Sequence, residues 1–272
     1  MRSGFSALVT ITLLVLGLLL LPATGSRGDE VKHDRAADTV SMLLRAYGGA
    51  DAVRNVASVI ARGRITEFLS GKSGQYARYF QRPGKLRVEV MPELGGDVRV
   101  LNGDRGWQAT EAGFAPVSQL ELQSMLYQYS YLNLPMALAS GSYHARFGGD
   151  QPYKGKETRL LFVEPKRAPR LGILVDARTG FIVRVDASFA MGGTGTGELS
   201  TEYGDFRPVN GVQFPHKLTS YAGGIKISEI VLDDIEVNRK IPIELFTPQE
   251  EELRKMPGKE GPAKEGEVKG EK

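Results

Sequence analysis

The chain has 272 residues, of which 41% are apolar, enough to bury a sizeable core as one large β domain or two small ones. Its 35 basic residues exceed its 32 acidic residues by three, and Arg2 together with the segment from Arg254 onward supplies that whole excess. The body of the chain is therefore close to neutral and has no basic stripe, which argues against nucleic-acid binding.

The first 25 residues have the pattern of a secretory signal peptide. Arg2 precedes an apolar run over residues 7–21, and the small residues Ala23 and Gly25 suit the last positions before a cleavage site. An uncleaved anchor is the alternative, but these 15 residues fall short of the roughly 20 that a spanning helix needs. The sequence contains no cysteine and so offers no site for a lipid anchor. We therefore predict a soluble periplasmic protein, cleaved near Gly25, with a polar linker over residues 26–33.

A domain is predicted over residues 34–256, and a helix begins it. Apolar residues recur there at helical spacing, and Gly48-Gly49 ends the pattern as a C-cap would. The apolar positions are Ala36, Ala37, Val40, Leu43, Leu44 and Tyr47. A short helical turn over residues 51–56 follows.

Period-two alternation then predicts a long antiparallel meander. In KLRVEVM, residues 85–91, apolar and charged side chains alternate, which is typical of a strand with one wet face. Similar runs occupy residues 59–69, 75–81, 98–101, 106–110, 143–147, 158–163, 171–176, 181–189, 198–206, 212–221 and 226–237. Turn signals rich in glycine, asparagine and aspartate separate many of these runs.

One predicted hairpin has an unusual composition. In YGDFRPVNGVQFPHKLTSY, residues 203–221, the pair Asn210-Gly211 favours a tight turn because both residues tolerate positive φ. Pro208 and Pro215 cannot donate ladder hydrogen bonds, which confines them to strand ends, bulges or an exposed edge. The hairpin therefore predicts a place where the sheet is interrupted.

A helix interrupts the meander between Ser118 and Ala139. Ser118 and Glu121 form a capping box, and an apolar stripe follows until Asn133-Leu134-Pro135 disrupts it. Thr247-Pro248 predicts the start of a short charged helix to about Lys255, and residues 257–272 are predicted to form a disordered charged tail.

The sequence lacks the signatures of an active site. His33, His144 and His216 have no metal-site spacing, so no metal or cofactor is predicted, and His216 reads as a structural or solvent-exposed residue. The GKS at residues 71–73 lacks the earlier glycine of a phosphate loop, and the glycine-rich residues 192–197 precede a strand rather than a helix. We therefore predict that the protein is not an enzyme.

Together these segments resemble the LolA/LolB-like class of periplasmic lipoprotein carriers, the outer-membrane lipoprotein-sorting proteins and their relatives. The resemblance rests on AYGGADAVRNVASVIARGRI, RPGKLRVEV, NGDRGW, VDARTGFIVRV and YGDFRPVNGVQFPHKL, and it covers roughly residues 34–246. It implies a mainly β fold with helices: a curved antiparallel half-barrel of about 11 strands, whose concave face the helices cover, with an apolar cavity between them. The prolines of the last hairpin would help to keep such a sheet open.

The resemblance further implies a carrier or chaperone that binds the acyl chains of lipoproteins, or another lipid, in this cavity. It also implies transient contact with membranes and a monomeric state. In the carriers an arginine is thought to hold the lid; Arg62 and Arg64 are the candidates here. The predicted ligand-binding residues are Leu86, Val88, Val90, Val98, Val100 and Trp107 on the sheet and Leu122, Met125, Leu126 and Tyr129 on the helix.

Two alternatives remain open at this point. The same apolar residues would serve equally well as a sealed core, because a cavity and a core use the same residue types. The chain would then suit a non-catalytic interaction module for an envelope protein partner, tethered by its charged tail.

Overall fold

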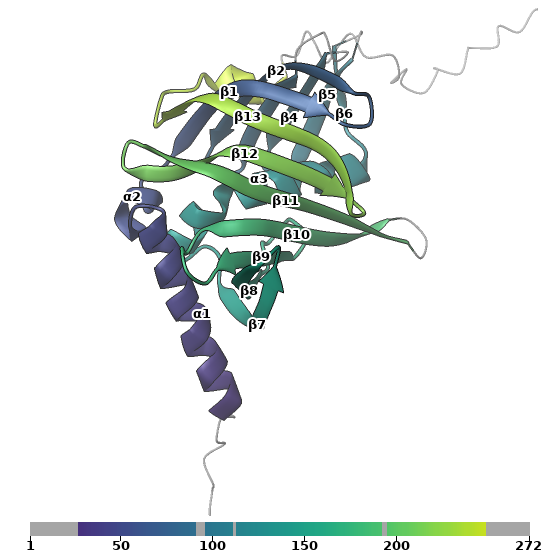
Figure 1. The fold of residues 1–272 in the computed structure, drawn as a ribbon. Helices are drawn as coiled ribbons and strands as arrows, with labels where there is room; N and C mark the ends of the chain where they lie inside the picture. The colour runs from purple at the N-terminus through teal and green to yellow at the C-terminus, as the bar shows by residue number, and fades with distance from the viewer. Residues whose placement is uncertain (1–26, 91–95, 111–112, 192–194, 249–272) are drawn as a thin grey trace, which may run out of the picture.

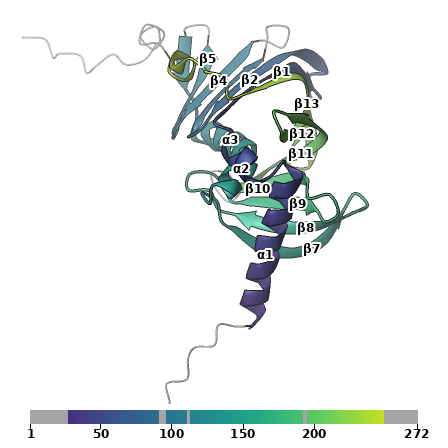
Figure 2. The same cartoon turned by 90° about the vertical axis from the view of Figure 1, so that its left-hand side faces the viewer.

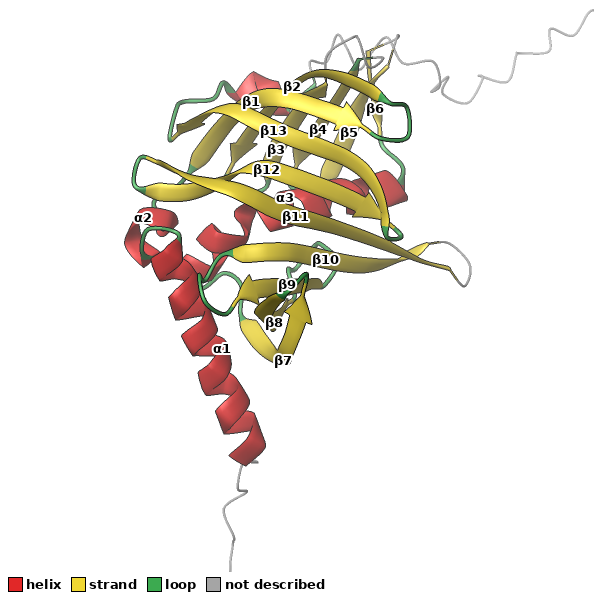
Figure 3. Ribbon diagram, in the orientation of Figure 1, coloured by secondary structure: helices red, strands yellow, loops and turns green. Residues whose placement is uncertain are grey.

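The computed structural model describes residues 27–90, 96–110, 113–191 and 195–248, which form a mainly β structure (Figure 1). Its helices are α1 (Arg27–Ala46), α2 (Ala50–Arg54), α3 (Gln119–Ala139) and the 3-10 helix η2 (Ile243–Phe246). Its strands are β1 (Ser58–Glu67), β2 (Lys72–Gln81), β3 (Lys85–Val90), β4 (Asp97–Asn102), β5 (Arg105–Thr110), β6 (Gly113–Pro116), β7 (Ala145–Tyr153), β8 (Lys156–Val163), β9 (Leu171–Asp176), β10 (Ile182–Met191), β11 (Gly195–Val209), β12 (Val212–Ala222) and β13 (Ile225–Val237). Figure 3 shows how strongly strands predominate.

All thirteen strands belong to one antiparallel sheet, in the order β6-β5-β4-β3-β2-β1-β13-β12-β11-β10-β9-β8-β7. Consecutive strands are neighbours in the sheet, except that β6 and β7 lie at its two edges, and at the centre the first strand, β1, pairs with the last, β13. The helix α3 joins the two edge strands β6 and β7, and it lies inside the curve of the sheet (Figure 2). The sheet is curved and does not close, as the sequence predicts.

The concave face is the apolar face of the strands. In β3 the burial alternates, with Leu86, Val88 and Val90 buried and the residues between them only partly covered. The helix α1 covers the β7 end of this face, where Arg35 forms a 2.6 Å ion pair with Asp150 and its guanidinium lies 4.1 Å from the Phe147 ring centre. A single core of buried side chains connects α1, α3 and the concave face.

The predicted hairpin between β11 and β12 is confirmed. Asn210 and Gly211 have φ values of 49° and 82°, as a tight two-residue turn requires. The strand β12 pairs with β11 from Val212 onward, but its ladder with β13 begins only at Lys217. Pro215 therefore lies on a part of β12 that has left β13, as its missing N–H allows.

The end of α1 covers this unpaired stretch of β12. The backbone N–H of Gln213 donates to the carbonyl of Tyr47 at 3.0 Å. A Cβ atom on Gly48 would lie 2.1 Å from the carbonyl oxygen of Gly211, so only glycine permits this approach. The segment between α1 and α2 thus lies where β12 has separated from β13.

The structure differs from the sequence prediction in several elements, among them the 3-10 helix η2, which was not predicted. The helix α1 begins at Arg27, so the segment predicted as a linker over residues 26–33 is helical where it is described. Several residues of this segment are charged residues that a helix accommodates without an apolar face. The helix α3 continues through Pro135 to Ala139. The four-residue strand β6 was not predicted.

The predicted signal peptide (residues 1–25), the short helix over residues 249–255 and the tail (residues 257–272) lie outside the described residues. Among the helices of the described part, none has the length and apolar character needed to span a membrane.

Candidate functional site

The candidate site lies between α3 and the concave face of the sheet. The capping box predicted at Ser118 and Glu121 is present, with the backbone N–H of Glu121 donating to Ser118 Oγ at 3.3 Å. The first turns of α3 pack closely on β5, because a Cβ atom on Gly106 would lie 3.2 Å from both Leu122 Cδ1 and Met125 Sδ. A larger residue at Gly106 would force these side chains to rearrange.

Tyrosine hydroxyls connect α3 to both halves of the sheet. The Gly84 N–H, in the β2–β3 turn, donates to Tyr129 Oη at 2.7 Å. On the other half, Tyr127 Oη donates to the Val185 carbonyl at 2.9 Å. The helix therefore bridges the two arms of the curved sheet.

A third tyrosine bond depends on the proline inside α3. Pro135 has no N–H, so the carbonyl of Tyr131, four residues earlier, lacks its usual helical donor. Tyr203 Oη, from β11, donates to that carbonyl at 3.2 Å. The proline thus creates an acceptor within the helix, and the sheet supplies the donor.

Burial raises the pKa of the hydroxyls of Tyr47, Tyr127, Tyr131 and Tyr203 above the ordinary tyrosine value. These hydroxyls therefore remain protonated at neutral pH. The tyrosines therefore contribute apolar rings and neutral hydroxyl groups to the space beneath α3.

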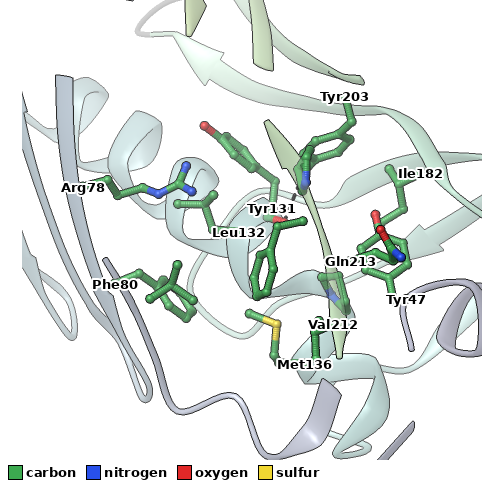
Figure 4. Close-up of a pocket in the computed structure, with 14 residues that line it drawn as sticks. Tyr47, Arg78, Phe80, Tyr131, Leu132, Met136, Ile182, Tyr203, Val212 and Gln213 are labelled. Carbon is green, nitrogen blue, oxygen red and sulfur yellow. Dashed lines mark hydrogen bonds between the residues drawn. The ribbon is translucent and has the colours of Figure 1, made fainter. Parts of the chain in front are cut away.

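Two cavities lie beneath α3. One of about 50 Å³ adjoins the unpaired part of β12, and Figure 4 shows Arg78, Tyr131 and Met136 among its lining residues. The other, of about 130 Å³, is lined by Val88 and Val90 as well as by Tyr131. The Tyr131 ring therefore separates two adjacent spaces on the same concave face.

Two wider clefts open toward solvent. One of about 460 Å³ lies between α1 and the start of β7 and is lined by Val40, Leu138 and Ala145. Another, of about 800 Å³, lies on the other side of α3, where Leu126 and Tyr129 line it together with Arg82, Lys166 and Arg167. The helix thus has two small cavities on one side and a larger cleft on the other.

The predicted ligand-binding residues divide between these places. Val88 and Val90 line the 130 Å³ cavity, and Leu86 is buried in the core on the same face. Leu126 and Tyr129 line the 800 Å³ cleft. Leu122 and Met125 pack over Gly106 instead.

The placement of Val98, Val100 and Trp107 on the cavity side is wrong. Residues directly opposite one another in an antiparallel pair share a face, and Val98 is opposite Glu89 while Val100 is opposite both Arg87 and Trp107. All three lie on the convex face. The 3-10 helix η2 lies against that face: the Arg87 guanidinium donates to the Leu245 carbonyl at 3.3 Å, and Phe246 is fully buried in a small apolar cluster with Ile60 and Ile241.

The interior arginine is also not one of the two candidates. Arg62 and Arg64 are exposed, and Arg62 forms ion pairs with Asp234 and Glu236 at 3.1 and 2.8 Å. The buried arginine is Arg78 on β2, only 4% exposed, which lines the 50 Å³ cavity. The sequence did contain the signal, because Arg78 lies two residues from both Tyr76 and Phe80 and therefore shares the apolar face of the strand with them.

His216 is buried, and its Nδ1 lies 3.1 Å from the Phe214 carbonyl oxygen, consistent with a structural role. Within the described ranges, no three His, Asp or Glu side chains gather as metal ligands would.

No family model and no curated protein matches the chain. Solved structures do. A candidate outer membrane lipoprotein-sorting protein domain from Vibrio parahaemolyticus is 11% identical, with a TM-score of 0.52 over 79% of this chain and 97% of that one. A DUF1329 family protein from Desulfovibrio piger is 11% identical, with a TM-score of 0.53 over 78% of this chain and 97% of that one.

A LolA superfamily protein from Nitrosomonas europaea also aligns, at 14% identity and a TM-score of 0.48, over 75% of this chain and 96% of that one. At such identities the first two likenesses establish architecture. This chain has the open, curved-sheet fold of the outer membrane lipoprotein-sorting proteins, which confirms the resemblance read from its sequence.

Proposed function

We propose that this protein is a non-catalytic periplasmic carrier or chaperone that binds acyl chains, of lipoproteins or of another lipid, between α3 and the concave face of its sheet. The observation that carries the proposal is that α3 covers an apolar concave face without filling the space beneath it. A fully sealed core would leave no such spaces between the helix and the sheet.

A complete acyl chain requires α3 to move. A cavity of about 150 Å³ holds a molecule the size of benzene, so the cavity of about 130 Å³ admits only part of a chain. Burying sixteen carbons contributes on the order of 12 kcal/mol, at about 0.8 kcal/mol per methylene. The tyrosine bonds that tie α3 to the sheet contribute about 0.5–1.5 kcal/mol each, and the buried side chains of α3 add to them. Binding a lipid must offset both contributions, which keeps the net affinity moderate and allows release.

Exchange with a membrane fits one end of the sheet. Phe68 and Leu69, in the β1–β2 turn, are 44% and 78% exposed, and Ile225 at the start of β13 is 63% exposed. The Phe68 N–H donates to the carbonyl of Ile227 at 2.9 Å, and Ile227 lines the 130 Å³ cavity. An apolar tip adjoining the cavity is suited to brief contact with a lipid surface.

A matched pair of variants tests the carrier function. Val88→Phe places a larger side chain in the 130 Å³ cavity, whereas Val98→Phe adds the same ring on the convex face. We expect the purified protein to bind a 16-carbon fluorescent fatty acid. Excluding about two methylenes should weaken binding by roughly tenfold in Val88→Phe and leave Val98→Phe close to the parent, as measured by fluorescence titration.

Equal binding by the two variants would contradict the location of the site. Failure of the parent protein to bind any lipid probe, together with no co-purifying lipid in native mass spectrometry, would contradict the function. Recovery of an envelope protein that is lost on deletion of residues 258–272 would then favour a tethered interaction module.

A further inference from the structure

Arg78 is a buried cation, and two of its guanidinium nitrogens have no hydrogen-bond partner among the described residues. Its Nε and Nη1 atoms are shielded from solvent and have no hydrogen-bond partner among the residues that the structure describes. Arg99, on the same face, differs in having a counter-charge: its Nε lies 2.7 Å from a carboxylate oxygen of Asp97, an ion pair although the contact does not have hydrogen-bond geometry. An arginine cannot lose its proton to escape burial, so an unpaired guanidinium in the interior is strongly unfavourable.

The guanidinium is directed into the space beneath α3. Figure 4 shows it turned from β2 toward Leu132 and Tyr131 of the helix. In the sheet, Arg78 is opposite Ala61 on one side and Val88 on the other, so small and apolar residues surround its base. Among the described residues, the Asp97 carboxylate on this face pairs with Arg99, and no carboxylate forms an ion pair with Arg78.

A second unpaired donor lies beside it. Tyr76, two residues earlier on β2 and therefore on the same face, has a buried hydroxyl without a hydrogen-bond partner among the described residues. Tyr76 lines the 130 Å³ cavity and Arg78 lines the 50 Å³ cavity. Three buried donor atoms thus face the junction of the two spaces.

Building on the proposed carrier function, we infer that the ligand is a single-chain amphiphile with an anionic head, a fatty-acid carboxylate, which binds head-inward at Arg78 and Tyr76. A carboxylate accepts two parallel hydrogen bonds from a guanidinium and can accept a third from a hydroxyl. It is also small enough for a cavity of about 50 Å³. The chain then runs through the 130 Å³ cavity along its apolar side, past Val88 and Val90, toward the exposed tip at Leu69 and Ile225.

The test compares a 16-carbon fluorescent fatty acid with its methyl ester, which has the same chain but no charge. We expect the parent protein to bind the acid at least tenfold more tightly than the ester. Arg78→Gln should abolish that preference while still binding the ester, and Tyr76→Phe should reduce the preference severalfold. Arg62→Gln, which removes an exposed and paired arginine, should leave it unchanged.

A lysophosphatidic acid with the same chain forms a separate arm and distinguishes a phosphate head from a carboxylate. Tighter binding of the phosphate lipid than of the fatty acid would overturn the carboxylate assignment. Equal affinity of the parent protein for acid and ester would overturn the inference but leave the carrier function intact, and this comparison needs no variant to fold. Binding of neither probe would contradict both.

Discussion

At the scale of single residues, Gly63 shows how one position sets the path of the central strands. The register between β1 and β13 shifts between Arg62 and Gly63. A Cβ atom on Gly63 would lie 2.0 Å from the Val231 carbonyl oxygen and 2.7 Å from the Leu232 Cα. Because both contacts are with backbone, the neighbouring strand has no side chain that could turn aside.

We therefore expect Gly63→Ala to destabilise the protein by about 3 kcal/mol or more, since overpacking against backbone forces the strands apart. Gly204→Ala in β11 is the matched control, because its new Cβ would meet only Lys217 Cβ, at an ordinary 3.8 Å. That control should stay within about 0.5 kcal/mol of the parent. Urea unfolding measures both, and similar losses in the two variants would contradict the steric explanation.

At this scale the sequence predicted where strands occur better than it predicted which side of each strand faces the interior. Alternation separates Val88 from Arg87 correctly, but it does not say which side of the next strand faces inward. In β4 the apolar residues Val98 and Val100 lie on the convex face, while Arg99 lies on the concave face. An amphipathic rule fails there because both faces are partly covered, and only the register with β3 decides the matter.

At the scale of elements, α3 was predicted in position and in its cap, but its continuation through Pro135 was not. Proline usually ends a helix because it removes a hydrogen bond and crowds the preceding turn. Here the missing donor is replaced by Tyr203 Oη, from a strand more than sixty residues further along the chain. No local pattern contains that partner, so the sequence could not reveal it. The strand β6 was not predicted because its four residues are too few to show an alternating pattern.

A double-mutant cycle tests this replacement. Tyr203→Phe should cost about 1–2 kcal/mol in the parent, because the Tyr131 carbonyl loses its donor. In a Pro135→Ala background the cost should be smaller, since the restored N–H of residue 135 can donate to the same carbonyl. Denaturant unfolding of the four proteins gives the coupling energy. Strict additivity of the two changes would show that the hydroxyl and the proline act independently.

At the scale of the whole molecule, the sequence predicted an open, curved antiparallel sheet with helices on its concave face. The apolar alternation, the turn residues and the resemblance to lipoprotein-sorting proteins agreed on it. The size of the space beneath α3 could not be predicted in the same way, because volume depends on how side chains from distant strands meet. The open end of the molecule, with its exposed apolar tip, likewise results from turns that are far apart in sequence.

That tip gives a prediction about membranes. The double variant Leu69→Ser, Ile225→Ser should bind vesicles of phosphatidylethanolamine and phosphatidylglycerol roughly tenfold more weakly, because two exposed apolar side chains no longer enter the lipid surface. Ile243→Ser removes a comparably exposed residue of η2, 51% exposed, and should have little effect. Co-sedimentation measures the three proteins. Equal losses in both variants would indicate non-specific adhesion rather than contact through the tip.

The pairing of β1 with β13 also governs how the chain can fold. Each arm consists of neighbouring hairpins that form quickly, whereas the join between the arms brings Val59 to Val237 and is slow to form. The backbone N–H and C=O groups on the β13 side of β1 therefore stay unpaired until almost the whole domain has been made. Unpaired strand edges invite association with other chains, so the nascent protein is most vulnerable to aggregation just before its final strand arrives.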